Sequence, residues 1–241
     1  MNNTIGIGTS GFGLARNRYV AVFPVVEVQQ TFYQPPRIST LERWRQEVPA
    51  AFEFTLKAWQ LITHEAKSPT YRRLKKKLTE TETTDCGAFK PTPIVREAWE
   101  VTRSCAAALG ARTILFQSPA SFTSTASNIA NLENFFSKTE RGDLNLCWEP
   151  RGDWEPAILQ RLCGDLDICH VVDPFVTQTV TPAKGYFRLH GRNGWRYKYE
   201  DSELQELVGQ VGTPAQGGSA YVFFNNSEMT DDAKRFQLLV E

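Results

Sequence analysis

The sequence predicts an α/β protein built as a single closed (β/α)8 barrel of the TIM type. Short apolar runs alternate with segments of helical period, there are eight such runs, and the chain has 241 residues. Eight parallel strands, each followed by a helix, close such a barrel in about 250 residues. No Ser/Gly-rich or Pro-rich linker interrupts the chain. We therefore expect one domain over residues 1–241.

The strands are predicted from short apolar or alternating runs bounded by turn residues. They are Thr4–Thr9, Val25–Gln30, Phe52–Ala58, Thr113–Gln117, Asn145–Glu149, Ile168–Asp173, Gly185–His190 and Ala220–Asn225. The first run contains G-x-G-x-x-G, which in a doubly wound sheet binds phosphate. Its first two glycines lie inside the strand and no strong helical segment follows. We interpret the match as chance, with glycines that let another backbone or a ligand approach closely.

The helices are predicted from apolar residues at spacings of three and four. They are Ser39–Val48, Pro93–Leu109, Ser127–Lys138, Glu155–Cys163, Ser202–Val211 and Thr230–Val240. Ser39 and Glu42 have the spacing of a capping box. Gly110 follows the second helix, as is common at helix C-termini.

Composition excludes several classes of protein. Formal net charge is zero, so no global field attracts nucleic acid or an anionic membrane. No apolar run reaches the ~18 residues of a membrane span, and the N-terminus lacks the features of a secretion signal. Five scattered cysteines without metal-site spacing predict buried free thiols in a reducing compartment. We expect a cytoplasmic protein.

Side-chain alternation predicts where the polar strand residues lie. One phase puts Val26, Val28, Phe54, Phe116, Trp148 and Phe187 outside, against the helices. The same phase puts polar residues inside, late in each strand, at Glu27, Gln29, Lys57, Gln117, Glu149, Asp173, Arg188 and His190. Active sites of such barrels lie at the C-terminal ends of the strands. Buried charges must pair, so we expect Lys57 and Arg188 to neutralise two of Glu27, Glu53, Glu149 and Asp173. A purely structural ion-pair network is the alternative to a site.

Residues 63–90 form a long polar excursion that carries a basic run. The run is Arg72, Arg73, Lys75, Lys76 and Lys77. A solvated helix and loop at the barrel rim is the favoured interpretation, and a basic lid over an anionic ligand is the alternative.

Several motifs occur together in order: T-F-Y at residue 31, K-A-x-x-x-I-T-H at 57, L-F-Q-x-P at 115, E-P-R-x-x-W at 149, R-L-H-G at 188 and F-N-N at 224. With these motifs the chain resembles the YecE-like family (domain of unknown function 72) of TIM-barrel proteins. The resemblance runs from the second strand to the last helix. It implies a TIM barrel and names no reaction. The long excursion departs from the shorter connection of many members.

The favoured hypothesis is an enzyme or binder of a small phosphorylated or otherwise anionic ligand at the barrel mouth. The catalytic candidates are Glu27, Lys57, Glu149, Asp173 and His190. The ligand-binding candidates are Tyr33, His64, Gln117, Arg151, Arg188, Arg192, Asn225 and Asn226. Glu149 or Glu27 is the candidate general base, and His64 or His190 the candidate general acid.

Two alternatives remain open. A metal-dependent sugar isomerase-like or hydrolase-like enzyme would bind a divalent ion through Glu27, Glu149, Asp173 and His190. No H-x-H or H-E-x-x-H spacing supports it, so we expect no metal and no cofactor. A non-catalytic module would bind nucleic acid or a protein through the basic run. Zero net charge disfavours a large phosphate footprint.

Overall fold

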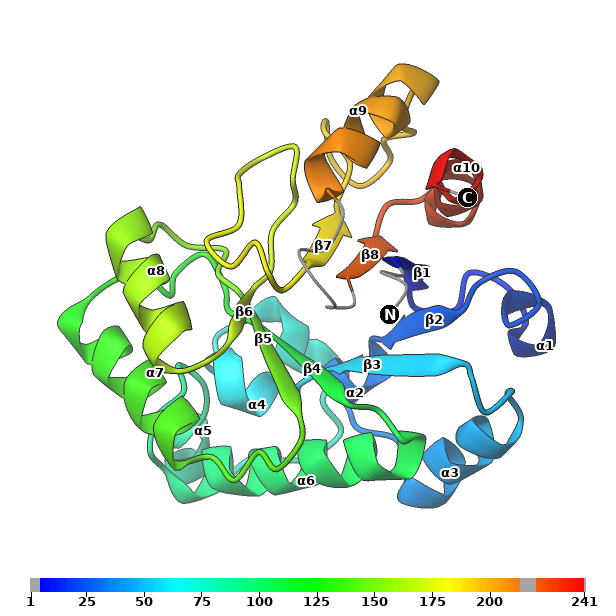
Figure 1. The fold of residues 1–241 in the computed structure, drawn as a ribbon. Coiled ribbons are helices and arrows are strands. Elements are labelled where there is room, and N and C mark those ends of the chain that lie inside the picture. Colours follow the sequence, from blue (N-terminus) through cyan, green and yellow to red (C-terminus); the bar gives the residue numbers. More distant parts are fainter. Residues whose placement is uncertain (1–4, 213–219, 241) are drawn as a thin grey trace. The chain divides into compact units, whose positions relative to one another are not determined.

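The computed structural model describes residues 5–212 and 220–240, in which every strand except β6 is followed by at least one helix (Figure 1). The strand order is β6-β5-β4-β3-β2-β1-β8-β7 in one sheet, and the paired strands run parallel. Val172, just after β6, forms a parallel bridge with Phe187 of β7, which links the two ends of this order. An open sheet has no such link, so the predicted TIM-barrel fold class is confirmed.

All eight predicted strands are present. They are β1 Ile5–Ser10, β2 Val25–Val28, β3 Glu53–Lys57, β4 Thr113–Gln117, β5 Asn145–Glu149, β6 Cys169–His170, β7 Tyr186–Leu189 and β8 Ala220–Phe224. The predicted start at Thr4 lies outside the described residues. Strand β6 is shorter than the predicted Ile168–Asp173. At the end of this strand, His170 N donates to Thr181 Oγ1 and His170 O accepts from Thr179 Oγ1.

The six predicted helices are present, with bounds that differ from the predicted ones by at most two residues, beside shorter helices that were not predicted. The helices are α1 Arg16–Tyr19, α2 Gln30–Tyr33, α3 Ile38–Gln46, α4 Gln60–Thr63, α5 Glu80–Asp85, α6 Pro93–Leu109, α7 Ala126–Lys138, α8 Pro156–Asp165, α9 Asp201–Val211, α10 Met229–Val240 and the 3₁₀ helix η1 Pro69–Arg73. Two of the differences have a clear structural reason. Gln30 belongs to α2 and not to a strand. Ser39 lies inside α3, because the Arg37 carbonyl accepts the first helical bonds, so the predicted capping box is not formed.

The chain divides into two compact units. Unit 1 comprises residues 1–28, 47–54 and 169–241, and unit 2 comprises residues 29–46 and 55–168. In unit 1, β1 pairs with β2 and β8, and β7 pairs with β8. In unit 2, β4 pairs with β3 and β5. The single domain predicted over the whole chain stays a prediction.

Gly8 shows why β1 carries glycines. A Cβ at this position would lie 2.2 Å from the carbonyl oxygen of Val25, so only glycine allows β1 and β2 to approach this closely. The tyrosine of α1 completes the contact, because the Tyr19 hydroxyl donates to the Val25 oxygen and accepts from the Thr9 backbone. The close approach that the sequence predicted is therefore between backbones.

The predicted outward-facing residues are all buried. Phe116 confirms the predicted phase, since its ring contacts Trp99 of α6 and Phe135 and Phe136 of α7. Two others have loop residues among their ring partners: Phe12 and Phe52 for Phe54, and Trp154 for Trp148.

All five cysteines are buried and free, as predicted. In the described part of the chain, no helix is both long enough and apolar enough to span a bilayer.

Candidate functional site

The predicted site residues fall in both units, and each unit is described by itself. Unit 1 holds Glu27, Asp173, Arg188, His190, Arg192, Asn225 and Asn226, and unit 2 holds Tyr33, Lys57, His64, Gln117, Glu149 and Arg151. Most of them form small clusters at the C-terminal ends of strands, whereas Tyr33, Arg192 and Asn226 have their contacts elsewhere. That all of them meet in one pocket stays a prediction.

The most buried cluster surrounds Glu27 of β2, which is fully shielded from solvent. Arg188 of β7 donates to Glu27 Oε1 through Nε at 3.1 Å and Nη2 at 2.9 Å. Ser10 Oγ donates to the same oxygen at 2.8 Å, and the Tyr186 hydroxyl donates to Oε2 at 2.6 Å. Arg188 therefore neutralises Glu27 as predicted, and both carboxylate oxygens are satisfied.

Sequence reasoning missed Ser10 and Tyr186. Tyr186 has the same strand parity as Arg188, and Ser10 is paired with Glu27 in the register of β1 and β2. The parity was visible in the sequence, whereas the register was not. A second expectation was wrong, because Glu53 at the start of β3 is exposed and accepts from the Tyr221 hydroxyl at 2.5 Å.

A second cluster of unit 1 joins Asp173, His190 and Asn225. Asp173 accepts from the His190 backbone at 2.9 Å and from the Phe175 backbone at 3.1 Å. The Asn225 amide nitrogen lies 3.1 Å from His190 Nδ1. An amide nitrogen only donates, so Nδ1 is the acceptor in this contact. Asp173 thus positions the backbone of His190, and Asn225 contacts its ring.

Two further candidates of unit 1 contact other parts of the unit. Arg192 forms ion pairs with Glu203 at 3.2 Å and Glu206 at 3.7 Å, both on α9. Buried Asn226 donates at 2.7 Å to the Tyr197 carbonyl and at 2.7 Å to Asp232. These contacts are those of residues that hold α9 and α10 to the sheet.

In unit 2, the central group is the Lys57 ammonium at the end of β3. Its side chain is only 7% exposed. Its nitrogen donates to Gln117 Oε1 at the end of β4 and lies 3.8 Å from the centre of the Phe32 ring on α2. A cation over an aromatic face is stabilised by the ring quadrupole. The fold therefore fixes one ammonium beside a neutral amide and a ring.

His64 follows α4 and lies in the same cluster. Its Nδ1 is 2.7 Å from Thr63 Oγ1, and its ring meets Phe32 edge-on at 5.0 Å. Burial, and secondarily the charge of Lys57, lowers the pKa of His64 from 6.5 to about 3. His64 is therefore neutral at pH 7. The general-acid role expected for it does not fit this pKa.

The backbone of His64 is held from two sides. The Tyr71 hydroxyl donates to the His64 carbonyl oxygen at 2.6 Å. Gly87, with φ +79°, packs so closely that a Cβ there would lie 2.3 Å from the same carbonyl. The buried ring is thus placed by rigid contacts of its own main chain.

Glu149 at the end of β5 faces Gln117 across the strand pair. Its buried carboxylate accepts from Arg151 Nη1 at 2.9 Å, and the Arg151 side chain is 40% exposed. In the same segment, Trp154 Nε1 donates to the Phe122 carbonyl at 2.8 Å. The E-P-R-x-x-W motif therefore combines a buried acid, a part-exposed arginine and a structural tryptophan.

Residues 63–90 include η1 and α5, and most of the basic run is exposed. Lys76 pairs with Glu82 at 3.1 Å and with Glu97 at 3.0 Å. Arg73 instead lies over the Tyr33 ring, 3.6 Å from its centre. The lid function stays a prediction.

The chain matches a known protein family over most of its length. The family described as "Protein of unknown function DUF72" matches residues 14–241. The chain belongs to the DUF72 family. YecE-like is another name for this family, so the resemblance predicted from the motifs is confirmed.

Relatives of this DUF72 protein agree over most of its length. The UPF0759 protein YunF of Bacillus subtilis (strain 168) is 26% identical over 92% of this chain and 84% of its own. A DUF72 family protein from Enterococcus faecalis V583 superposes with a TM-score of 0.76 at 19% identity, over 98% of this chain and 95% of that one. One from Thermotoga maritima MSB8 gives 0.71 at 23% identity, over 98% and 99%.

The DUF72 fold is also similar to proteins of other families. A xylose isomerase domain containing protein from Salmonella typhimurium LT2 gives a TM-score of 0.54 at 14% identity, over 95% of this chain and 94% of that one. Endonuclease IV from Thermus thermophilus gives 0.52 at 9% identity, over 98% and 97%. At these identities the likeness concerns the fold alone.

Proposed function

We propose that this DUF72 protein binds a small phosphorylated or otherwise anionic ligand at Lys57. The observation that carries the proposal is the place of this ammonium: at a strand's C-terminal end, beside Gln117, His64 and Phe32. A lysine binds phosphate as a point charge. The C-terminal ends of strands are where barrel proteins build their sites.

Neighbouring side chains of unit 2 supply further groups to the proposed site. Arg151 is part-exposed and offers additional N–H donors beyond the one given to Glu149. Neutral His64 offers one ring nitrogen as a donor or acceptor without adding charge. Buried Glu149 is the candidate general base if the protein is an enzyme. The proposal is thus anion binding first, with catalysis by Glu149 as its extension.

The two alternative functions have weaker support. Among residues 5–212 and 220–240, no three His, Cys, Asp or Glu side chains are grouped so that they could hold a metal ion. Binding of nucleic acid as the main function would need a large basic surface, and formal net charge is zero.

The test is a ligand screen by thermal unfolding. Sugar phosphates, nucleotides and inorganic phosphate should include a compound that raises the melting temperature, because a ligand of the native state stabilises it. Lys57→Met should weaken binding of that compound by ~1–3 kcal/mol, the scale of a lost charge-assisted hydrogen bond. Lys138→Met, at the exposed end of α7, removes the same charge and should leave binding unchanged. A compound that stabilises wild type and Lys57→Met equally would contradict the proposal.

A further inference from the structure

A second candidate site lies on another side of α2. Successive residues of a helix point in directions about 100° apart. Phe32 contacts Lys57, whereas the next residue, Tyr33, lines a pocket of about 630 Å³ between α2, the segment that follows it and η1. Pockets for small ligands are typically about 300–1,000 Å³. All lining residues belong to unit 2.

The pocket is strongly cationic. Arg37, Arg73 and Lys75 line it, and none of its lining residues is acidic. Within the described residues, none of these three side chains forms an ion pair or donates a hydrogen bond. Elsewhere in the same excursion the fold supplies acids, since Lys76 pairs with Glu82 and Glu97. The charge of this pocket is therefore left for an external anion.

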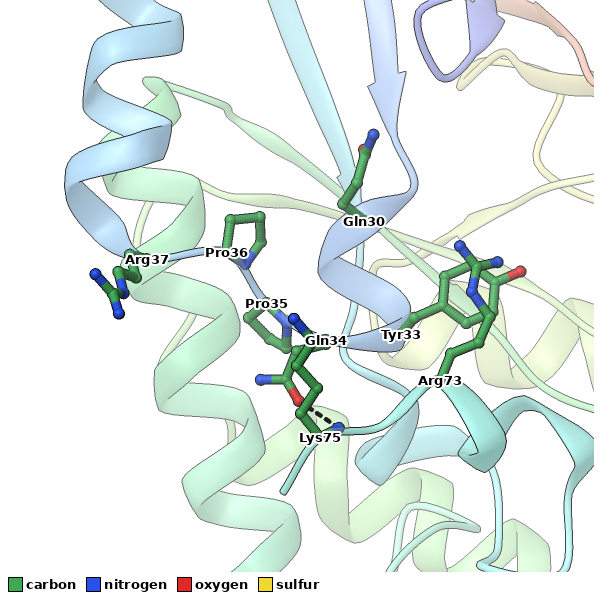
Figure 2. A pocket seen from close by; sticks show the side chains of 8 residues that line it. All are labelled: Gln30, Tyr33, Gln34, Pro35, Pro36, Arg37, Arg73 and Lys75. Atoms are coloured by element: carbon green, nitrogen blue, oxygen red, sulfur yellow. Dashed lines mark hydrogen bonds between the residues drawn. The ribbon is translucent and has the colours of Figure 1, made fainter. Parts of the chain in front are cut away.

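Several contacts hold the walls of the pocket in place, and Figure 2 shows two of them. The Arg73 guanidinium lies 3.6 Å from the centre of the Tyr33 ring, and Gln34 Oε1 accepts from the Lys75 backbone at 3.0 Å. Gln60 donates to the Tyr33 carbonyl at 2.8 Å. A guanidinium stacked on a ring keeps its edge N–H groups available for phosphate. Such restraint lowers the entropy lost when a ligand binds.

The remaining lining groups indicate what kind of anion fits. Gln34 uses its oxygen for Lys75, so its amide nitrogen is left to donate to an acceptor. Pro35 and Pro36 lie between Arg37 and Arg73 in the view and offer a rigid apolar surface without donors (Figure 2). Cations at both ends with an apolar middle match an organic molecule that carries more than one phosphate. A single phosphate would meet only part of the charge.

We propose that this pocket binds a small organic molecule with two or more phosphate groups, independently of the Lys57 site. Sugar bisphosphates and nucleoside diphosphates share this chemistry. The proposal assigns a role to Arg73 and Lys75, two members of the basic run, and none to Lys77, which is exposed and does not line the pocket.

The test is titration calorimetry with fructose 1,6-bisphosphate, ADP, glucose 6-phosphate and pyrophosphate. At least one of fructose 1,6-bisphosphate and ADP should bind, and it should bind about tenfold or more tightly than glucose 6-phosphate. The compound of the two that binds more tightly shows whether the pocket prefers a sugar bisphosphate or a nucleoside diphosphate. Arg73→Gln and Lys75→Gln should each weaken that binding about tenfold. Lys77→Gln, which makes the same charge change close by in the same run, should leave it unchanged.

Two further results decide between this site and the one at Lys57. Lys57→Met should retain the bisphosphate affinity, which separates failure of this proposal from failure of the proposed function. Tyr33→Leu should weaken binding by removing the platform under Arg73, and Tyr33→Phe should not. The proposal would be overturned if neither fructose 1,6-bisphosphate nor ADP bound. It would also be overturned if Arg73→Gln and Lys77→Gln bound the compound with equal affinity. Binding of oligonucleotides without either compound would overturn it as well.

Discussion

The Glu27 cluster of unit 1 and the pocket beside α2 in unit 2 both collect arginine, but they balance its charge differently. Arg188 is 1% exposed, and two of its nitrogens donate to the fully buried Glu27. Arg73 is exposed, and its contact in the described chain is the face of Tyr33. The first arginine has an anion that the fold supplies. The second has a neutral ring.

Burial explains the difference. An unpaired charge in the interior is destabilising by several kcal/mol, so a buried guanidinium requires a carboxylate from the same fold. An exposed guanidinium stays hydrated and needs none. Its anion can therefore be a ligand. A buried arginine that is paired with a carboxylate of the same chain therefore indicates a structural role. A cluster of exposed cations with no acidic residue beside them indicates a binding surface.

The largest effect is expected from breaking the buried pair. Arg188→Met should lower the free energy of unfolding by about 3–5 kcal/mol, because it leaves the Glu27 carboxylate buried without its guanidinium. Denaturant unfolding measures the loss. The double variant Glu27→Gln with Arg188→Met removes both charges and should recover part of it. A single variant within about 1 kcal/mol of wild type would show that the pair is not structural.

An intermediate effect is expected from acid, through His64. Its pKa of about 3 in the folded chain lies below the unfolded value of 6.5, so below pH 6.5 the unfolded chain binds more protons. The stability that neutral His64 contributes is therefore present above pH 6.5 and is lost as pH falls towards 3. Between pH 7 and pH 4, wild type should lose about 2–3 kcal/mol more than His64→Gln. Unfolding free energies at both pH values measure this, and parallel losses would contradict the assigned pKa.

The smallest effect is expected at the exposed arginine. Arg73→Gln should change the free energy of unfolding by less than about 0.5 kcal/mol, since exposed side chains without a carboxylate partner contribute little to stability. The same denaturant experiment measures it, with Lys77→Gln as the matched control. A loss comparable with that of Arg188→Met would mean that Arg73 holds the fold, and the contrast between the two regions would fail.

The fold could be predicted from sequence because its signals are periodic. Eight apolar runs and the two-residue alternation of strands placed every strand, and the longer helices have enough turns to show their period. Helices α2 and α4 have four residues each and thus about one turn, which shows no period. The segment at Gln30 was assigned to a strand for this reason. The predicted end of β6 at Asp173 was too late, and the side chains of Thr179 and Thr181 bond the backbone of its last residue, His170.

The candidate sites were predictable only in part. Alternation indicated that Glu27, Lys57 and Arg188 are buried on one side of their strands. It did not give their partners, because Tyr186 meets Glu27 across 159 residues of sequence through strand register. The contact of Arg73 with Tyr33 depends on how η1 packs on α2, which no local pattern encodes. The basic run was visible in the sequence. Which of its members pair with an acidic side chain depends on tertiary packing.

The buried cysteines can be used to measure local opening of the structure. Unit 1 contains one thiol, at Cys169, and unit 2 contains four, at Cys86, Cys105, Cys147 and Cys163. A buried thiol reacts with an alkylating reagent only when the surrounding structure opens, and burial also raises the pKa of Cys105 to about 11, which keeps it protonated. Peptide mapping after timed alkylation of the wild-type chain would therefore give the rate at which the structure opens around each cysteine, separately for the two units and without any introduced label.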